Sequence, residues 1–172
     1  MILYHGTTEK RALQILADRI VRANVERFYK EEYNGDGFSS DGYVYLTNEI
    51  TFSVYFANSH SAIDDSQRLY LFCFDIPNKL IEPDYDEIRY QGAAHSGTHY
   101  PNDILYSLYE FKSCRVRFDI PLDEYDAKYC IIDKSTISQI EKVYYNVGYN
   151  YDYVIGHYTP FQRQFIDSLE WK

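Results

Sequence analysis

The chain has 172 residues, 45% of them hydrophobic, and a formal net charge of −9 at pH 7. This length predicts one domain covering 1–172 that can bury a core without metals or disulfides. The acidic balance disfavours charge-driven binding to a nucleic-acid backbone, and no stretch approaches the roughly 20 apolar residues of a membrane span. The sequence does not open with a basic segment followed by an apolar run, so we expect a cytoplasmic protein without a membrane partner.

The N-terminal stretch predicts a short strand at about 1–5, followed by a helix. His5 and Gly6 stand where that strand is expected to end, and Thr7 or Thr8 can cap the helix. Apolar residues then recur at three- and four-residue spacing, so one face of the helix should pack on a sheet.

Residues 21–41 are polar and rich in charge and contain two glycines, and we expect a long loop that is functional or mobile. Basic residues cluster before and within it: Lys10, Arg11, Arg19, Arg22, Arg27 and Lys30. They are either the solvated face of the helix and the following loop or a local patch for transient nucleic-acid contact.

A second β-prone run, 42–47, leads into a helix that we expect to start at the N-cap Asn48 and end near Ala62. Residues 68–76 form a continuous apolar run that ends at Pro77. Such a run predicts a strand in the centre of a sheet.

The pattern from 83 to 113 leaves the order of elements open, apart from a helical piece at about 103–112. His95 and His99 have helical i, i+4 spacing, but Gly97 argues against a helix there, so we expect no metal site. The remaining predicted elements are strands at about 114–120, 128–133, 139–147 and 152–157, and a helix from Pro160 to Leu169.

Three cysteines lie far apart, without the spacing of a metal site. Cys73 and Cys130 each fall inside an apolar, strand-like run, while Cys114 precedes one. We expect buried thiols that form no disulfide, which is typical of a reducing compartment.

Three features follow one another along the first part of the chain: His5-Gly6-Thr7 after a strand, Tyr45 in a Gly-x-x-Tyr strand, and a serine-bearing helix. In this order and spacing the chain resembles the ADP-ribosyltransferase family, in its His-Tyr-Glu branch, and specifically its small toxin or defence members. The resemblance covers about the first third of the chain. It implies an α+β fold, a split antiparallel β-sandwich with flanking helices, with NAD as co-substrate in the cleft between the sheets.

The resemblance also implies how NAD would be bound. His5 would bind the adenosine ribose, the backbone of Gly6 would hold the nicotinamide amide, and the Tyr45 ring would stack on the nicotinamide. Ser53 aligns with the amide-binding serine of the family and Phe56 with its second stacking aromatic. The residues expected to bind NAD are His5, Gly6, Thr7, Tyr45, Ser53 and Phe56.

The family's catalytic glutamate begins a late strand and stabilises the oxocarbenium character that develops as nicotinamide leaves. The matching strand here begins at Lys128, and the nearest acids are Asp126 and Glu124. A bulge or shifted register could bring one of these acids into the site. Alternatively, the glutamate was replaced at Ala127 or Lys128 in a disabled variant, or the protein is a natural pseudoenzyme.

We therefore expect an NAD-dependent mono-ADP-ribosyltransferase that cleaves the nicotinamide N-glycosidic bond and transfers ADP-ribose to a protein or nucleic-acid acceptor. The expected catalytic residues are His5, Tyr45 and either Asp126 or Glu124. Glu141, in a Gln-x-Glu run like that of the arginine-modifying branch, is a minor candidate. An effector of this kind would be held in check by an antitoxin protein, and the acidic, tyrosine-rich composition suits a protein partner.

Three other interpretations stay open. A catalytically dead module that binds NAD, ADP-ribose or a partner protein would keep His5 and the stacking aromatics but not the acid. An RNA 2′-phosphotransferase would share the fold, but it would display several arginines and histidines near the site. Finally, the His-Gly-Thr run could be accidental in a tyrosine-rich domain of another kind.

Overall fold

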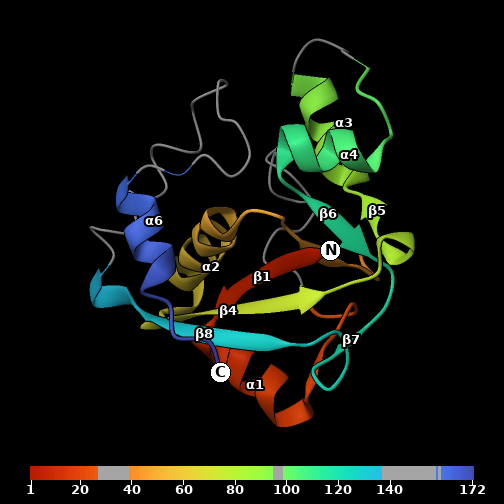
Figure 1. Cartoon of the computed structure of the whole chain (residues 1–172). Coiled ribbons are helices and arrows are strands. Elements are labelled where there is room, and N and C mark those ends of the chain that lie inside the picture. The colour runs from red at the N-terminus through yellow and green to blue at the C-terminus, as the bar shows by residue number, and fades with distance from the viewer. Residues whose placement is uncertain (27–38, 95–98, 137–157, 159) are drawn as a thin grey trace.

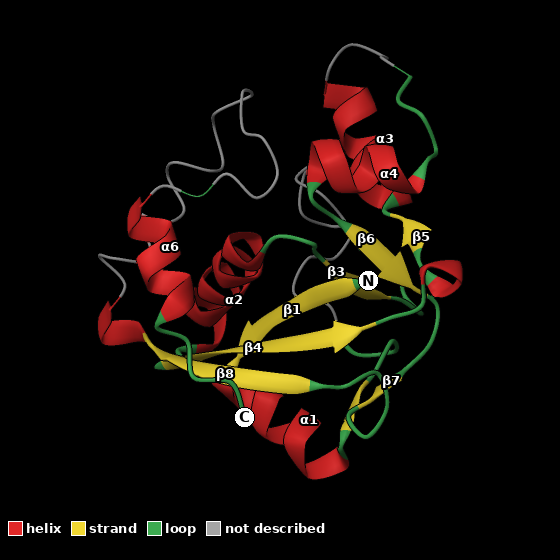
Figure 2. Ribbon diagram, viewed as in Figure 1, coloured by secondary structure: helices red, strands yellow, loops and turns green. Residues whose placement is uncertain are grey.

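The computed structural model describes the whole chain except residues 27–38, 95–98, 137–157 and 159 (Figure 1). Several sequence predictions lie outside the described residues: much of the loop at 21–41, His95, Glu141, and the strands at 139–147 and 152–157. The described part combines antiparallel sheets with helices, which confirms the α+β class in its coarse form (Figure 2). No helix within it is both long and apolar enough to cross a bilayer.

The strands form two antiparallel three-stranded sheets and one two-stranded ribbon. The first sheet has the order β1-β4-β8, the second has the order β3-β6-β5, and β2 pairs with β7. The bounds are β1 Ile2–Thr8, β2 Ile20–Val21, β3 Val44–Leu46, β4 Arg68–Asp75, β5 Glu82–Pro83, β6 Cys114–Val116, β7 Ile120–Pro121 and β8 Lys128–Asp133.

Helices cover both faces of the first sheet and one end of the second (Figure 1). Their bounds are α1 Glu9–Asp18, α2 Ile50–Asp64, α3 Tyr85–Ala94, α4 Ile104–Tyr106 and α6 Pro160–Asp167, with shorter turns η1 Asn78–Leu80, η2 Ser107–Phe111 and η3 Lys134–Thr136. The predicted helical piece at 103–112 is confirmed as α4 and η2, and the predicted C-terminal helix starts at Pro160 as expected.

Strand β4 is central, as its continuous apolar run predicts. Leu69 and Leu71 pack in the core under α2, while Tyr70, Phe72 and Phe74 point to the opposite face, in the core that α1 covers. All five are at most 3% exposed. Because both faces of β4 are buried, the run shows no polar alternation.

Two boundaries near the predicted site are wrong. β1 continues to Thr8, because β4 is long enough to pair with it down to Leu69, so His5 and Gly6 lie inside the strand rather than at its end. Helix α2 begins after Glu49, not after Asn48, since the Thr47 hydroxyl accepts the Glu49 N–H at 2.9 Å and so turns the chain one residue later.

Two further predictions are corrected in the second half of the chain. The predicted strand at 114–120 is divided into β6 and β7, because the chain leaves the second sheet after Val116 and pairs with β2 instead. Cys114 and Cys130 are buried, but Cys73 is only partly buried, and none of the three forms a disulfide.

The C-terminal segment packs on the α2 side of the first sheet. Phe165, Ile166, Leu169 and Trp171 add to the core beneath α2. The backbone of Lys172 exchanges hydrogen bonds of 2.9 and 3.1 Å with that of Tyr129 in β8. The chain end therefore lies beside β8 (Figure 1).

Candidate functional site

The two three-stranded sheets meet at one bridge and then part. Tyr4 and Thr47 exchange backbone hydrogen bonds of 2.8 and 2.9 Å, and the pairing of β1 with β3 does not continue beyond them. In an antiparallel strand, successive residues direct their N–H and C=O groups to opposite sides. The N–H and C=O of Gly6 therefore face the same side as those of Tyr4, away from β4 and toward the gap between the sheets.

A side chain takes the place of the missing ladder at this point. His5 Nδ1 lies 3.0 Å from the carbonyl oxygen of Tyr45. A carbonyl can only accept, so this contact assigns the ring proton to Nδ1. If the pairing of β1 with β3 continued, the Tyr45 carbonyl would face the backbone of Gly6. The His5 imidazole bonds to this carbonyl instead, so the Gly6 backbone is hydrogen-bonded in neither the β1–β3 pairing nor the β1–β4 pairing.

Gly6 is required by the close approach of α2. A Cβ built on Gly6 would lie 2.6 Å from the carbonyl carbon of Ser53 and closer still to its oxygen. Only a residue without a side chain lets the backbone of α2 lie this close to β1. The structure thus brings Gly6 and Ser53 together across the strand and the helix.

The two predicted side chains on α2 differ in exposure. Ser53 is 1% exposed and its hydroxyl donates to the carbonyl of Ile50 at 2.6 Å. Phe56 is 38% exposed, and its ring centroid lies 6.0 Å from that of Phe52 and 5.3 Å from that of Tyr55. Phe56 therefore offers an aromatic surface, whereas the Ser53 hydroxyl is bonded within the helix.

Tyr45 is held by a polar cluster that the sequence did not reveal. Its hydroxyl donates to the carboxylate of Asp86 in α3. The same carboxylate accepts the Ser40 N–H and the Ser40 hydroxyl, both at 2.9 Å, and Arg115 Nη1 at 3.2 Å. We call Ser40, Tyr45, Asp86 and Arg115 the Tyr45 cluster. It joins β3, α3, β6 and the segment before β3.

The electrostatics of the Tyr45 cluster favour a charged Asp86 and a neutral Tyr45. Burial raises the pKa of Asp86, but the hydrogen bonds from Tyr45 and Ser40 and the charge of Arg115 outweigh it, so the pKa lies below its usual value. Burial, and then the hydrogen bond to Asp86, raise the pKa of the Tyr45 hydroxyl. The hydroxyl therefore remains a donor at neutral pH.

No family model, curated protein or solved structure matches the chain. The interpretation of the site therefore depends on its own residues and geometry.

The start of β8 is built differently from the split. Lys128 pairs with Cys73 of β4, and Cys73 in turn pairs with Tyr4 of β1. Lys128 therefore lies nearly level with the split, but two strands away from it. Its side chain is exposed. By the alternation of side chains, Lys128 points to the same face as Tyr4 and Gly6. The position that the resemblance assigns to the glutamate thus carries an ammonium group.

Asp126 and Glu124 lie in the turn before β8 and are both exposed. Asp126 has a left-handed φ of 48°, and the preceding Tyr125 accepts the N–H of Asp75 at 2.7 Å, at the end of β4 away from the split. With strands about 4.8 Å apart and a rise of about 3.3 Å per residue, the backbones of Asp126 and His5 are on the order of 14 Å apart. The structure brings His5 and Tyr45 together, but neither acid joins them.

Thr7 and His60 complete the surroundings of His5. Thr7 is 3% exposed in β1. Burial, helped by the charge of Arg11 and by His5, lowers the pKa of His60 in α2 to about 4. Arg11 also donates to the carbonyl of Glu26 at 2.5 Å. The sequence interpretation missed His60, because a lone histidine in an apolar helix carries no signal of its own.

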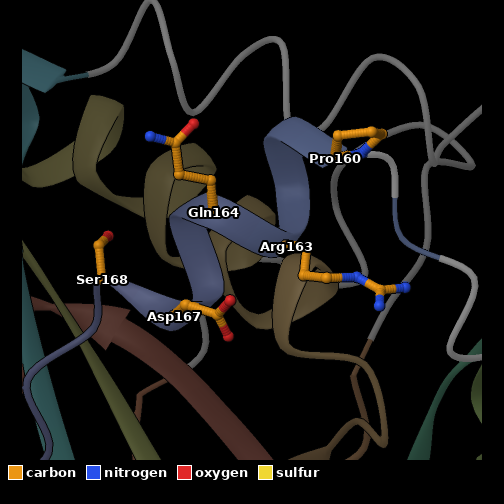
Figure 3. A pocket seen from close by; sticks show the side chains of 5 residues that line it. All are labelled: Pro160, Arg163, Gln164, Asp167 and Ser168. Atoms are coloured by element: carbon orange, nitrogen blue, oxygen red, sulfur yellow. The ribbon is translucent and has the colours of Figure 1, made fainter.

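A hollow of about 500 Å³ lies elsewhere, along α6 (Figure 3). Its lining residues are Pro160, Arg163, Gln164, Asp167 and Ser168. It is shallow and open, and none of the residues predicted to bind NAD lines it. Within the described residues no three His, Cys, Asp or Glu side chains gather as metal ligands.

One missed element did have a sequence signal. Asp84 accepts the N–H groups of Asp86 and Glu87 at 3.2 and 3.1 Å, which caps α3. An acid followed three residues later by glutamate is a pattern that begins helices. The contact of Asp86 with Tyr45 had no such signal, because the two residues are 41 positions apart.

Proposed function

We propose that this chain is an ADP-ribosyltransferase-type domain that binds NAD at the split between β1 and β3 and transfers its ADP-ribose to a macromolecular acceptor. The observation that carries this proposal is the contact of His5 with the Tyr45 carbonyl, which leaves the N–H and C=O of Gly6 facing the gap. A donor and an acceptor side by side on one residue suit a primary amide such as that of nicotinamide.

The fold supports the same proposal. Two antiparallel sheets that share one backbone bridge and then part are the arrangement that a split β-sandwich requires. The parting of the sheets and the position of His5 beside it are properties of this chain's own residues.

In the proposed reaction the ring of Tyr45 stacks on the nicotinamide and Gly6 binds its amide. The bond between C1′ of the ribose and the pyridinium nitrogen breaks, and its electron pair stays on nicotinamide. A lone pair of the acceptor forms the new bond at C1′, and the acceptor's proton passes to solvent. Positive charge develops on the ribose meanwhile, so a nearby carboxylate accelerates the step.

A second candidate function follows from Lys128. Its exposed ammonium stands at the position of the expected glutamate, while Glu124 and Asp126 lie in the exposed turn before β8. A positive charge there opposes the charge that develops on the ribose. This observation favours a module that binds NAD or ADP-ribose without turning it over.

Labelled NAD distinguishes the two functions. The protein, a Lys128→Glu variant and a Lys79→Glu control would each be incubated with labelled NAD and with separate protein and RNA fractions from cells. Lys79 is an exposed lysine in η1, so the control makes the same charge change away from the split. Nicotinamide release and labelling of the acceptor are measured.

Each outcome decides between the candidates. Turnover by the unaltered protein establishes the transferase and names its acceptor class. Turnover by Lys128→Glu alone supports the binding module, with its missing acid restored. If all three proteins are inactive and calorimetry shows no binding of NAD or ADP-ribose, both candidates fail.

A further inference from the structure

Asp86 is placed to act on Tyr45 rather than on solvent. Asp86 is 5% exposed and lies in the first turn of α3. Its Oδ2 atom accepts the Tyr45 hydroxyl, Arg115 Nη1 and the Ser40 N–H, and Oδ1 accepts the Ser40 hydroxyl. A buried carboxylate with this many donors keeps a fixed position, because any movement breaks several charge-assisted hydrogen bonds at once.

Arg115 fixes the carboxylate from the second sheet. The guanidinium carbon lies 3.7 Å from the ring centroid of Tyr43 and 4.9 Å from that of Tyr85. Arg115 is 6% exposed and its Nε also lies 3.8 Å from the Glu82 carboxylate. Packing between two aromatic rings restricts a guanidinium to few orientations, so Asp86 is held from β6 as well as from α3.

Tyr45 is consequently fixed at both ends. Its backbone carbonyl accepts from His5, and its hydroxyl donates to Asp86. The ring between these two contacts cannot rotate without losing the hydroxyl contact. A stacking ring that is already in its bound orientation spends less entropy when a ligand arrives.

We propose that Asp86, held by Arg115, is a positioning residue that fixes the Tyr45 ring for the nicotinamide half of NAD. This inference rests on the proposed function, because it takes Tyr45 as the stacking residue. The second sheet and α3 then set the affinity for the nicotinamide half of NAD, while the ADP-ribose half is bound elsewhere in the site. Affinity for NAD and affinity for ADP-ribose should therefore separate when the Tyr45 cluster is broken.

The test uses two variants that break the same contact from opposite sides. Tyr45→Phe keeps the ring but removes the hydroxyl, and it leaves Asp86 paired with Arg115. Asp86→Asn removes the charge. Binding of NAD and of ADP-ribose is measured by calorimetry, and thermal unfolding is followed for each protein. We expect each variant to bind NAD about tenfold more weakly, as for the loss of one hydrogen bond to a charged group, with little change for ADP-ribose.

Tyr43 supplies a matched control on the same strand. Its hydroxyl accepts from Arg117 Nη2 at 2.7 Å, and its ring centroid lies 6.5 Å from that of Tyr45. Tyr43→Phe removes the same atom but leaves the contact between Tyr45 and Asp86 intact. The ratio of NAD to ADP-ribose affinity should be unchanged in this variant.

The double variant separates positioning from general stability. If Asp86 acts through the Tyr45 hydroxyl, Tyr45→Phe combined with Asp86→Asn should bind NAD no more weakly than Tyr45→Phe alone. Three outcomes would overturn the positioning role and leave the proposed function intact. The losses of NAD affinity could be additive in the double variant, a variant could lose affinity for NAD and ADP-ribose equally, or Tyr45→Phe could bind NAD as tightly as the unaltered protein. If the unaltered protein binds neither ligand, the proposed function and this inference are both overturned.

Discussion

The split beside His5 and the turn before Lys128 are built in opposite ways. At the split, partly buried polar contacts hold Tyr45 at both ends, and α2 lies against Gly6 with no room for a side chain. Before β8, the acids Glu124 and Asp126 are exposed and the chain takes left-handed conformations. The half of the site that would bind is rigid, and the half that would supply the acid is an open turn.

Under the proposed function, this difference separates recognition of the ligand from catalysis. Rigid, buried contacts suit recognition, because they fix the ligand's orientation before it arrives. Catalysis of glycosidic cleavage needs an additional charge near the ribose. Unfolding experiments on variants test whether the two regions differ as much in stability as they do in structure.

Gly6→Ala should have the largest effect. Its Cβ would overlap the Ser53 carbonyl, so α2 must move or β1 must bend, and we expect a loss of at least about 3 kcal/mol in the free energy of unfolding. Urea unfolding measures it. Gly42→Ala is the control: Gly42 has a φ of 81° but its Cβ would meet only Asn24 Oδ1 at 3.8 Å, so the loss should be about 1 kcal/mol. Equal losses would mean that α2 is not tightly packed on β1.

His60 should make stability at the split depend on pH. Burial lowers its pKa in the folded protein to about 4 from a usual value of 6.5. Between these values the unfolded chain binds the proton and the folded protein does not, so stability is complete above about pH 6.5 and falls as the pH drops toward 4. The loss is up to about 3 kcal/mol.

The measurement is urea unfolding at several pH values in that range. His60→Gln should flatten the dependence, since Gln cannot take up the proton. The charged neighbours Arg11 and Asp64 are present in both proteins. An unchanged slope would show that His60 is more hydrated than its buried position indicates.

Ala127→Glu and Lys128→Glu compare two adjacent positions where β8 begins, one packed against the core and one exposed. Ala127 packs against the core that α1 covers, so a carboxylate there should reduce the free energy of unfolding by about 2 kcal/mol. Thermal or urea unfolding gives this value. A negligible effect would mean that the face of Ala127 opens to solvent.

Lys128→Glu should have the smallest effect on stability, within about 0.5 kcal/mol, because the side chain is exposed. The same variant restores an acid for the turnover experiment, so its activity can be compared without a correction for unfolding. A large destabilisation would contradict the exposed placement of Lys128.

The elements that the sequence predicted well are those with a local cause. The apolar run of β4 predicts a buried strand, and Pro160 marks the start of α6 because its ring fits the first turn of a helix. Lys128–Asp133 matches its predicted strand as well. Each of these patterns lies within a few neighbouring residues of the sequence.

The predictions that failed depend on distant partners. The end of β1 is set by the length of β4, and the start of α2 is set by the Thr47 side chain rather than by Asn48. The proximity of His5 to Tyr45 was anticipated only through a family resemblance. The contact of Tyr45 with Asp86 could not be foreseen, because nothing near either residue indicates its partner.

The two backbone hydrogen bonds between Tyr129 and Lys172 have a consequence for association. Among the described strands, β8 is at the edge of its sheet, and an edge strand with open N–H and C=O groups can recruit a strand from another molecule. Lys172 occupies these groups at Tyr129, near the start of β8. Displacing the segment that carries Lys172 would leave these backbone groups open, so its pairing with Tyr129 opposes the addition of a foreign strand at this part of β8.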